Sequence, residues 1–197
     1  MVASRNTRKR VAHGGTVQAR LSKEEWLARA LEVLGKKGAG ELTIESLARH
    51  LGVTKGSFYW HFKDRADFFR QLIEYWDEHF TQTVIVEISS QGGPPEERLL
   101  ELMRLVLTKR LDRFEMPVRA WVQQNPALAP LLRKVDRHRV SFVRLLFLEM
   151  GFDEDEADTR TRIFLTYMIT QRSLLPPTAG SKQFTDLRKR AAFFTHH

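Results

Sequence analysis

The chain has 197 residues, of which 42% are hydrophobic, and a formal net charge of +8. This length is enough for one large or two small hydrophobic cores, and the absence of cysteine excludes disulfide bonds, thiol catalysis and zinc sites with cysteine ligands. The sequence lacks both the run of roughly 20 apolar residues that a membrane-spanning helix needs and the apolar segment of a secretion signal. We therefore expect a cytoplasmic protein with no membrane partner.

Positive charge is concentrated at the start of the chain. Residues 1–70 contain 14 Lys and Arg against 7 Asp and Glu, which leaves 18 against 17 for the remainder. A local excess of this kind is typical of proteins that bind a polyanion. The densest part, residues 1–18, has few apolar residues and is predicted to be a disordered basic arm. Such an arm could contact DNA phosphates or enter a minor groove, or it could act only as a solubilising tail.

The first predicted helix follows this arm. Ser22 and Glu25 have the spacing of a capping box, in which each side chain accepts a hydrogen bond from the other residue's backbone amide. Apolar residues then recur at helical spacing from Trp26 to Leu34, and the pattern ends at Gly38. These features predict a helix that packs its apolar face on the two helices that come next.

Residues 43–62 predict two short helices joined by a glycine turn. Thr43 is a candidate N-cap, and the apolar residues that follow it lie on one helical face. Gly52 supplies the left-handed conformation that ends a helix, and Thr54 is a candidate N-cap for the second helix. Two helices connected in this way form a helix-turn-helix unit, whose second helix enters the major groove of DNA. A plain helical hairpin is the alternative, but it would not need so many hydrogen-bond donors on its second helix.

The rest of the chain also predicts helices and no strand. The predicted ranges are 64–88, 96–114, 118–125, 126–150, 153–175 and 181–194. Asn125 is expected to cap the helix that begins at Pro126, and the long helix 64–88 could connect the helix-turn-helix unit mechanically to the second half. The sequence therefore predicts an all-α fold of about nine helices.

The segment from Thr43 to Lys63 resembles the DNA-binding domain of the TetR family of transcriptional repressors. The resemblance is carried by Ala48, Gly52, Val53, Tyr59, Phe62 and the Lys63-Asp64 helix start. The run from Gly52 to Phe62 follows the family's recognition-helix pattern. The resemblance covers about residues 19–79 and implies a helix-turn-helix DNA-binding domain there. Residues 80–197 resemble the family only in their helical layout, which implies a C-terminal domain for effector binding and dimerisation.

The resemblance also implies which residues contact DNA. The implied set is Thr43, Thr54, Lys55, Gly56, Ser57, Tyr59, His61 and Lys63. Lys55 and Gly56 match positions that reach base edges, with Lys55 able to donate to guanine acceptors. The side chains from Ser57 to Lys63 match positions that contact phosphates. Tyr59 and Trp60 could instead pack in the core, and we favour this alternative more for Trp60 than for Tyr59.

A single recognition helix reads few bases, so we expect a homodimer on a palindromic operator, with half-sites ~34 Å apart. The resemblance implies a four-helix bundle built from the helices 154–175 and 181–194 of both subunits. The candidate interface residues are Ile163, Tyr167, Phe184, Leu187 and Phe194. Burial of these side chains in the core of their own subunit is the alternative.

We further expect that a small-molecule effector of unknown identity binds in the second half and releases the protein from DNA. The candidate effector-binding residues are Phe114, Trp121, His138, Phe142, Phe164 and Tyr167. Each of them could instead be an ordinary core residue, because apolar residues at helical spacing mostly fill cores.

Other functional classes have little support in the sequence. There is no helical histidine pair at metal-ligand spacing, no glycine-rich phosphate loop after a strand and no serine elbow. The sequence therefore predicts neither an enzyme, nor a metal site, nor a cofactor. An effector-independent helix-turn-helix protein remains the alternative, and its affinity for DNA would not respond to small molecules.

Overall fold

The computed structural model describes the backbone of residues 21–174 and 181–196, and the side chains of residues 21–171 and 186–196. The predicted basic arm, residues 1–18, lies outside the described residues. Every regular element in the described part is helical, which confirms the all-α prediction. The α-helices are α1 (Lys23–Lys37), α2 (Ile44–Leu51), α3 (Lys55–Tyr59), α4 (Arg65–Asp77), α5 (Thr83–Ser90), α6 (Pro95–Thr108), α7 (Glu115–Gln124), α8 (Ala129–Glu149), α9 (Glu154–Leu174) and α10 (Ser181–Thr195).

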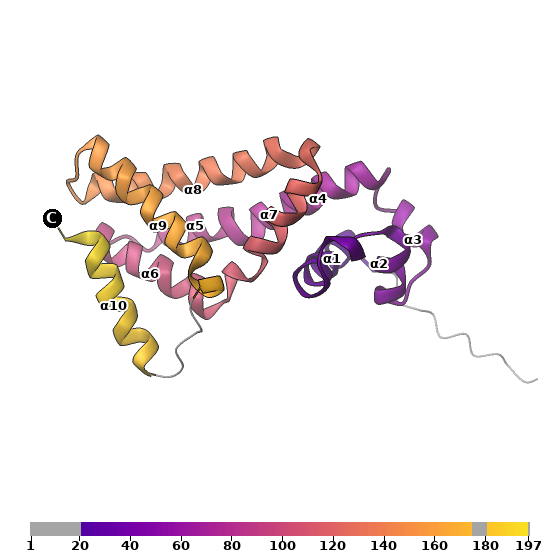
Figure 1. The fold of residues 1–197 in the computed structure, drawn as a ribbon, viewed down its shortest axis with the longest axis horizontal. Coiled ribbons are helices and arrows are strands. Elements are labelled where there is room, and N and C mark those ends of the chain that lie inside the picture. Colours follow the sequence, from indigo (N-terminus) through magenta and orange to yellow (C-terminus); the bar gives the residue numbers. More distant parts are fainter. Residues whose placement is uncertain (1–20, 175–180, 197) are drawn as a thin grey trace, which may run out of the picture.

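Shorter segments join some of these helices. A π-helical segment, Glu78–Gln82, makes α4 and α5 one continuous helix, so the described chain has nine separate α-helical rods, as the sequence predicts. Three 3-10 turns are η1 (Ala39–Glu41), η3 (Leu111–Phe114) and η4 (Pro126–Leu128). The helices α1–α3 lie at one end of the molecule and α9 and α10 at the other, with α4–α5 and α8 running between them (Figure 1).

Local hydrogen bonds explain where the first helices begin and end. Ser22 and Glu25 form both bonds of the predicted capping box, and Thr43 Oγ1 accepts from the Ser46 amide at 3.1 Å. Gly52 ends α2 with a φ of 66°, in the left-handed region that glycine tolerates best. Thr54 occupies the predicted N-cap position of α3 with an extended backbone, but its side chain makes no capping hydrogen bond.

Two predicted boundaries in the second half are wrong. The helix expected to reach residue 114 ends at Thr108, because Arg110 adopts a φ of 51° and turns the chain into η3. Asn125 does not cap the following helix. Its side-chain amide donates instead to the Trp121 carbonyl at 2.9 Å, which closes α7, and Pro126 then opens a 3-10 turn before α8 begins at Ala129.

Two clusters of buried apolar side chains hold the fold together. The first joins α1–α4 to α7 and to the start of α8, and the second joins α5, α6, α9 and α10 to the rest of α8. Trp121 of α7, for example, meets the Phe69 ring of α4 edge-on, with ring centroids 4.9 Å apart. The N-terminal helices therefore share their core with α7. Among the described residues, no helix has the length and apolarity to cross a membrane.

We predict that Gly52→Ala lowers the free energy of unfolding by about 1–2 kcal/mol, because alanine is strained in the left-handed conformation. The measurement is urea denaturation at a fixed protein concentration. Gly40→Ala is the matched control, since a Cβ at Gly40 meets no atom within 4 Å and Gly40 does not have a positive φ. Equal losses in the two variants would contradict the role given to the Gly52 turn.

Candidate nucleic-acid interface and enclosed cavity

The helix α3 has one buried and one exposed face. Phe58 and Phe62 are 0% and 2% exposed, and each meets the Trp26 ring edge-on, at centroid distances of 5.7 and 6.4 Å. On the other side, Tyr59 is 60% exposed and Trp60 is 72% exposed. The alternative that these two residues pack in the core is therefore wrong. The difference is clearest for Trp60, because its large apolar side chain favoured a buried position.

The residues implied in DNA contact lie around this exposed face. Thr43, Thr54, Lys55, Gly56, Tyr59 and Lys63 are exposed, whereas Ser57 and His61 are half-buried. The structure thus brings the N-terminus of α2 and the exposed face of α3 to the same end of the molecule (Figure 1).

The Lys55 ammonium is already paired. Its Nζ lies 2.6 Å from Glu45 Oε1 on α2, and both side chains are more than half exposed. The hydrogen bond from Lys55 lowers the pKa of the Glu45 carboxyl. Exposed pairs of this kind contribute little net stability, so Lys55 can exchange Glu45 for another acceptor without unfolding the turn.

The His61 side chain and the Lys63 backbone amide have different partners. His61 Nε2 donates to the Leu21 carbonyl at 2.8 Å, which ties the start of the described chain to the end of α3. The Lys63 amide donates to the Asp67 carboxylate at 3.1 Å. Hydrogen bonds from the Gln71 side chain and from the Lys63 amide lower the pKa of Asp67 to about 2. The Lys63 side chain remains exposed, whereas the ring of His61 is fixed beside Leu21.

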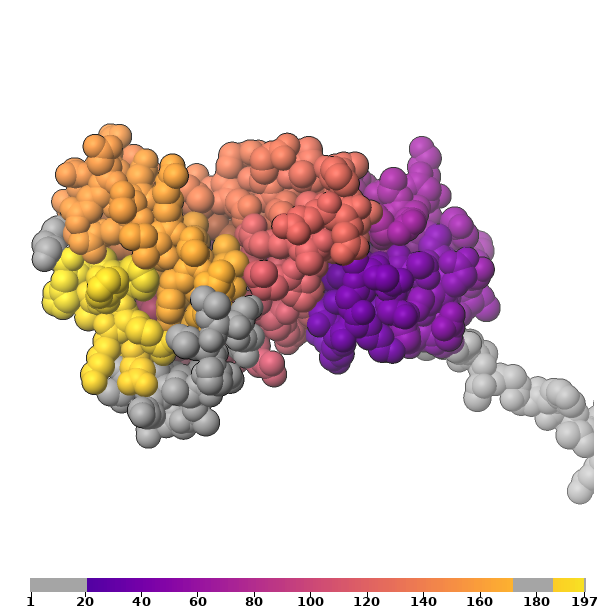
Figure 2. Space-filling model, in the orientation of Figure 1, coloured from indigo at the N-terminus to yellow at the C-terminus, as the bar shows by residue number. Residues whose placement is uncertain are grey.

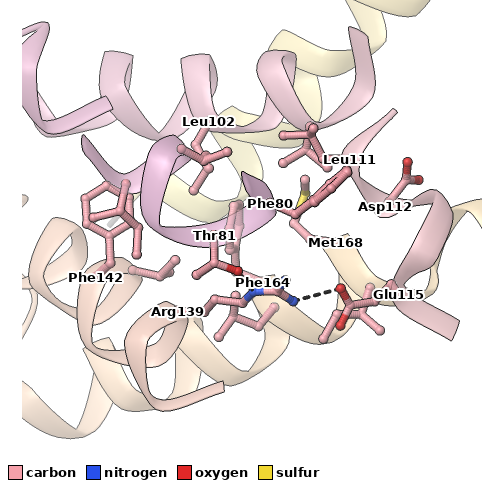
Figure 3. Close-up of a pocket in the computed structure, with 16 residues that line it drawn as sticks. Phe80, Thr81, Leu102, Leu111, Asp112, Glu115, Arg139, Phe142, Phe164 and Met168 are labelled. Carbon is pink, nitrogen blue, oxygen red and sulfur yellow. Dashed lines mark hydrogen bonds and ion pairs between the residues drawn. The ribbon is translucent and has the colours of Figure 1, made fainter. Parts of the chain in front are cut away.

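A cavity of about 80 Å³ lies in the second half of the chain. Its walls come from the π-helical segment and the start of α5, from α6, from η3 and the start of α7, and from α8 and α9. Its walls are mainly apolar, and its polar groups are Thr81, Asp112, Glu115 and Arg139 (Figure 3). The cavity lies in the second half of the chain, where the sequence predicted an effector. Phe142 and Phe164, two of the predicted effector residues, line it.

The four other predicted effector residues lie elsewhere. Phe114 packs edge-on against Phe80 and Trp121 belongs to the N-terminal core. His138 lies beside Asp77, with Nδ1 3.3 Å from Oδ2. The Tyr167 hydroxyl accepts from Arg190 Nη1 at 2.6 Å. These side chains are occupied by packing or polar contacts outside the cavity, because helical spacing indicates burial but does not indicate which space a side chain borders.

Sequence analysis missed the polar groups of the cavity. Arg139 Nε donates to Thr81 Oγ1 at 2.9 Å, and its Nη1 donates to Glu115 Oε2 at 2.8 Å. Glu115 Oε1 accepts from Arg119 at 2.8 Å, and Arg119 also donates to Asp136 at 2.6 Å. Glu115 and Arg119 are four positions apart on one helix, but the other partners are 17 to 58 positions apart, so no local sequence pattern could have connected them.

The candidate dimer residues differ in exposure. Ile163 is 53% exposed on α9, whereas Leu187 and Phe194 are 2% and 6% exposed in the second core cluster. Phe194 meets the Phe164 ring edge-on at 5.2 Å. Burial in the subunit's own core, the alternative, thus describes these two positions in the single chain. The Phe184 side chain lies outside the described residues.

Comparison with known proteins places this geometry in a family. A family model described as bacterial regulatory proteins of the tetR family matches residues 27–72. The transcriptional regulator AcrR of Shigella flexneri is 28% identical over 105 residues, which are 51% of this chain and 49% of AcrR. The chain therefore spans about half the length of that curated relative.

Solved structures agree with the sequence match. A TetR transcriptional regulator from Legionella pneumophila superposes with a TM-score of 0.74 at 14% identity, over 89% of this chain and 98% of that one. AibR, crystallised with isovaleryl coenzyme A and operator DNA, superposes with a TM-score of 0.66 at 15% identity, over 88% and 98%. At these identities the structures show a shared fold. The fold, the family match at residues 27–72 and the helix-turn-helix geometry lead to one conclusion: this part of the chain is a helix-turn-helix domain of the tetR family of bacterial regulatory proteins.

Proposed function

We propose that this protein is a sequence-specific DNA-binding repressor that a small molecule releases from a palindromic operator. The observation that carries the proposal is the exposed polar face of α3, which Gly52 turns outward and which Phe58 and Phe62 anchor from below. Helices presented in this way enter the major groove and read base edges with their N-terminal residues. The operator DNA in the AibR complex supports the same role for this chain.

Each residue of this face has a proposed task. Lys55, at the start of α3, exchanges Glu45 for a guanine acceptor. At Gly56 no side chain separates the helix backbone from a base. A Cβ there would project into the open space in front of α3, with only Thr54 Oγ1 nearby, at 3.7 Å. The Tyr59 hydroxyl and the Lys63 ammonium donate to phosphates, as do Ser57 and the N-termini of α2 and α3 at Thr43 and Thr54. His61 contributes through its hydrogen bond to the Leu21 carbonyl, which holds its ring at the edge of this face, beside the phosphate that we assign to it.

The proposed repressor is a homodimer. Two subunits are required to place two α3 helices in successive major grooves, ~34 Å apart. We propose that α9 and α10 form the interface, with the exposed Ile163 side chain and its half-buried neighbour Tyr167 in contact with the partner subunit. The buried side chains of Leu187 and Phe194 support α10 from within rather than meet the partner directly.

The cavity is the proposed effector site, and two routes connect it to α3. The first is the continuous helix α4–α5, whose π-helical segment contributes Phe80 and Thr81 to the cavity. The second is η3, which contributes Leu111 and Asp112 to the cavity. A ligand that favours one arrangement of these segments would change the spacing of the two α3 helices, and a differential affinity of ~1–3 kcal/mol is enough for such control.

The contact between η3 and α1 is close. The Phe114 ring lies against Gly35, where an added Cβ would come within 2.8 Å of the ring, and Arg113 Nη2 lies 2.7 Å from Glu32 Oε1. The space-filling view shows α1 directly against the part of the chain around residues 110–130 (Figure 2). A shift of η3 is therefore felt by α1, and through it by the helix-turn-helix unit.

The effector-independent alternative makes a different prediction. It has the same DNA surface but requires no cavity, and the affinity for DNA would not change with any small molecule. The π-helical segment at the cavity favours effector control, since π-helical turns inside α-helices occur frequently at functional sites.

We predict that Lys55→Ala and Lys63→Ala weaken DNA binding in different ways. On duplexes selected from a random pool, Lys55→Ala relaxes the preference at one base pair, by about 1–3 kcal/mol. Lys63→Ala weakens binding to all sequences and reduces the slope of log affinity against log salt by about 1. The measurement is fluorescence anisotropy over a salt series. Lys109→Ala, which removes an equally exposed lysine from its pair with Glu87 on the second half, is the matched control and leaves binding unchanged. Identical small effects from all three variants would refute the proposed surface.

We predict that Gly35 and Phe114 are energetically coupled. Gly35→Ala alone lowers the free energy of unfolding by about 1–3 kcal/mol, because the buried Phe114 ring cannot make room for the added methyl group. In a Phe114→Ala background the same change has little effect, since the obstructing ring is gone. A double-mutant cycle by urea denaturation measures the coupling. Additive losses would show that η3 and α1 are not in the contact described.

A further inference from the structure

The charge of Arg139, the one cation among the described residues that line the cavity, is already balanced. Arg139 is paired with Glu115, whose side chain is 5% exposed, and Glu115 is also paired with Arg119. In Figure 3 the Asp112 carboxylate points away from Arg139 and Thr81. An anionic ligand would have to compete with Glu115 for Arg139, and a cationic ligand would enter beside the guanidinium. Both would bury charge without a free counter-ion, which is unfavourable.

The hydrogen-bonding groups of the cavity are not balanced in the same way. Both carboxylate oxygens of Glu115 already accept from arginines. The Thr81 oxygen accepts from Arg139 Nε, so its hydroxyl hydrogen is available for donation. Within the described part of the chain, Arg139 forms hydrogen bonds through Nε and Nη1, and its Nη2 forms none. Around Thr81 and Arg139 the cavity therefore offers donors, and the remaining acceptor of the lining, the Asp112 carboxylate, points away from both (Figure 3).

The remaining walls limit the ligand to a small apolar body. Phe80, Phe142, Phe164, Leu102 and Met168 face the space around Thr81 and Arg139 (Figure 3). The volume of about 80 Å³ is smaller than the engineered cavity of about 150 Å³ that binds benzene in another protein. Met168 can adjust, because its unbranched side chain changes shape easily. A single ring or a short chain is the largest body that fits with only such adjustment.

From these three observations we infer that the cavity binds a small, uncharged, mainly apolar molecule with one hydrogen-bond acceptor, such as a carbonyl oxygen. The acceptor receives hydrogen bonds from the Thr81 hydroxyl and Arg139, and the hydrocarbon part lies among the phenylalanine rings. This inference rests on the proposed effector control, because it names the class of effector that the site accepts.

The test compares three probes that share one ring: cyclohexanone, cyclohexylamine, which is cationic at pH 7, and cyclohexanecarboxylate, which is anionic. Binding to the full chain is measured by saturation-transfer NMR titration. We expect cyclohexanone to bind at least about tenfold more tightly than either ion, since a buried unpaired charge or donor weakens binding by about that factor or more. Equal or tighter binding of either ion, or binding of none of the three, overturns the inference.

Two variants locate the binding. Thr81→Val keeps the shape of the side chain but removes its hydroxyl, so it weakens cyclohexanone binding about tenfold. Thr83→Val is the matched control, because Thr83 is exposed on the same helix and bonds only to the Glu78 carbonyl; it leaves binding unchanged. Val106→Phe, which fills the cavity, abolishes binding while the helical circular-dichroism signal is kept. Unchanged binding in both Thr81→Val and Val106→Phe places the ligand elsewhere and overturns the inference.

DNA binding is measured separately, so the two proposals can fail independently. If cyclohexanone binding depends on Thr81, the result supports the ligand class. If this binding leaves the affinity for DNA unchanged, it contradicts effector control by ligands of this class. DNA binding through α3 without cyclohexanone binding retains the DNA-binding function and overturns the ligand class.

Discussion

Phe58 and Phe62 are buried against Trp26 and Phe68, and this contact decides what α3 presents to solvent. The Phe62 and Phe68 rings meet at a centroid distance of 4.9 Å, and Phe58 and Phe68 at 5.3 Å. Because α3 has only five residues, fixing two rings on one side leaves the remaining side chains little freedom to rotate inward. The polar surface at this end of the molecule is thus a consequence of aromatic packing underneath it.

The same aromatic core joins the two halves of the molecule. Trp121 and Val118 of α7 belong to the cluster that holds α1–α4, and the same helix begins directly after η3 and contributes Glu115 to the cavity. Well-packed interiors transmit displacement because side chains have few alternative positions. The helix-turn-helix unit therefore shares its core with the second half of the chain. A displacement of the cavity walls would reach it through the Phe80–Phe114 ring contact as well as along α4–α5.

Local signals in the sequence were sufficient for the helix-turn-helix unit. The capping box at Ser22 and Glu25, the Thr43 cap and the left-handed Gly52 turn depend on residues within four positions of one another. Asn125 shows the limit of such signals, because an asparagine side chain can bond backward to a carbonyl as readily as forward to an amide. Arg110, a non-glycine residue with positive φ, left no signal at all.

The cavity proposed as the effector site could not be predicted in the same way. The aromatic residues at helical spacing correctly indicated a buried second half, but only two of the six candidates border the cavity. The polar groups that define its chemistry come together only after α4–α5, α7 and α8 have packed. Thr81 and Arg139 are 58 positions apart, and Glu115 and Arg139 are 24 apart, so their pairing is a property of the tertiary fold.

The most direct measurement of the central claim uses the tryptophans. Trp26, Trp76 and Trp121 are at most 1% exposed, whereas Trp60 at the end of α3 is 72% exposed, so acrylamide quenches mainly Trp60. If α3 lies against DNA, a duplex bound at low salt protects Trp60 and lowers the quenching, and Trp60→Phe removes this change. Unchanged quenching at DNA concentrations that saturate the protein in a gel-shift assay would contradict the account.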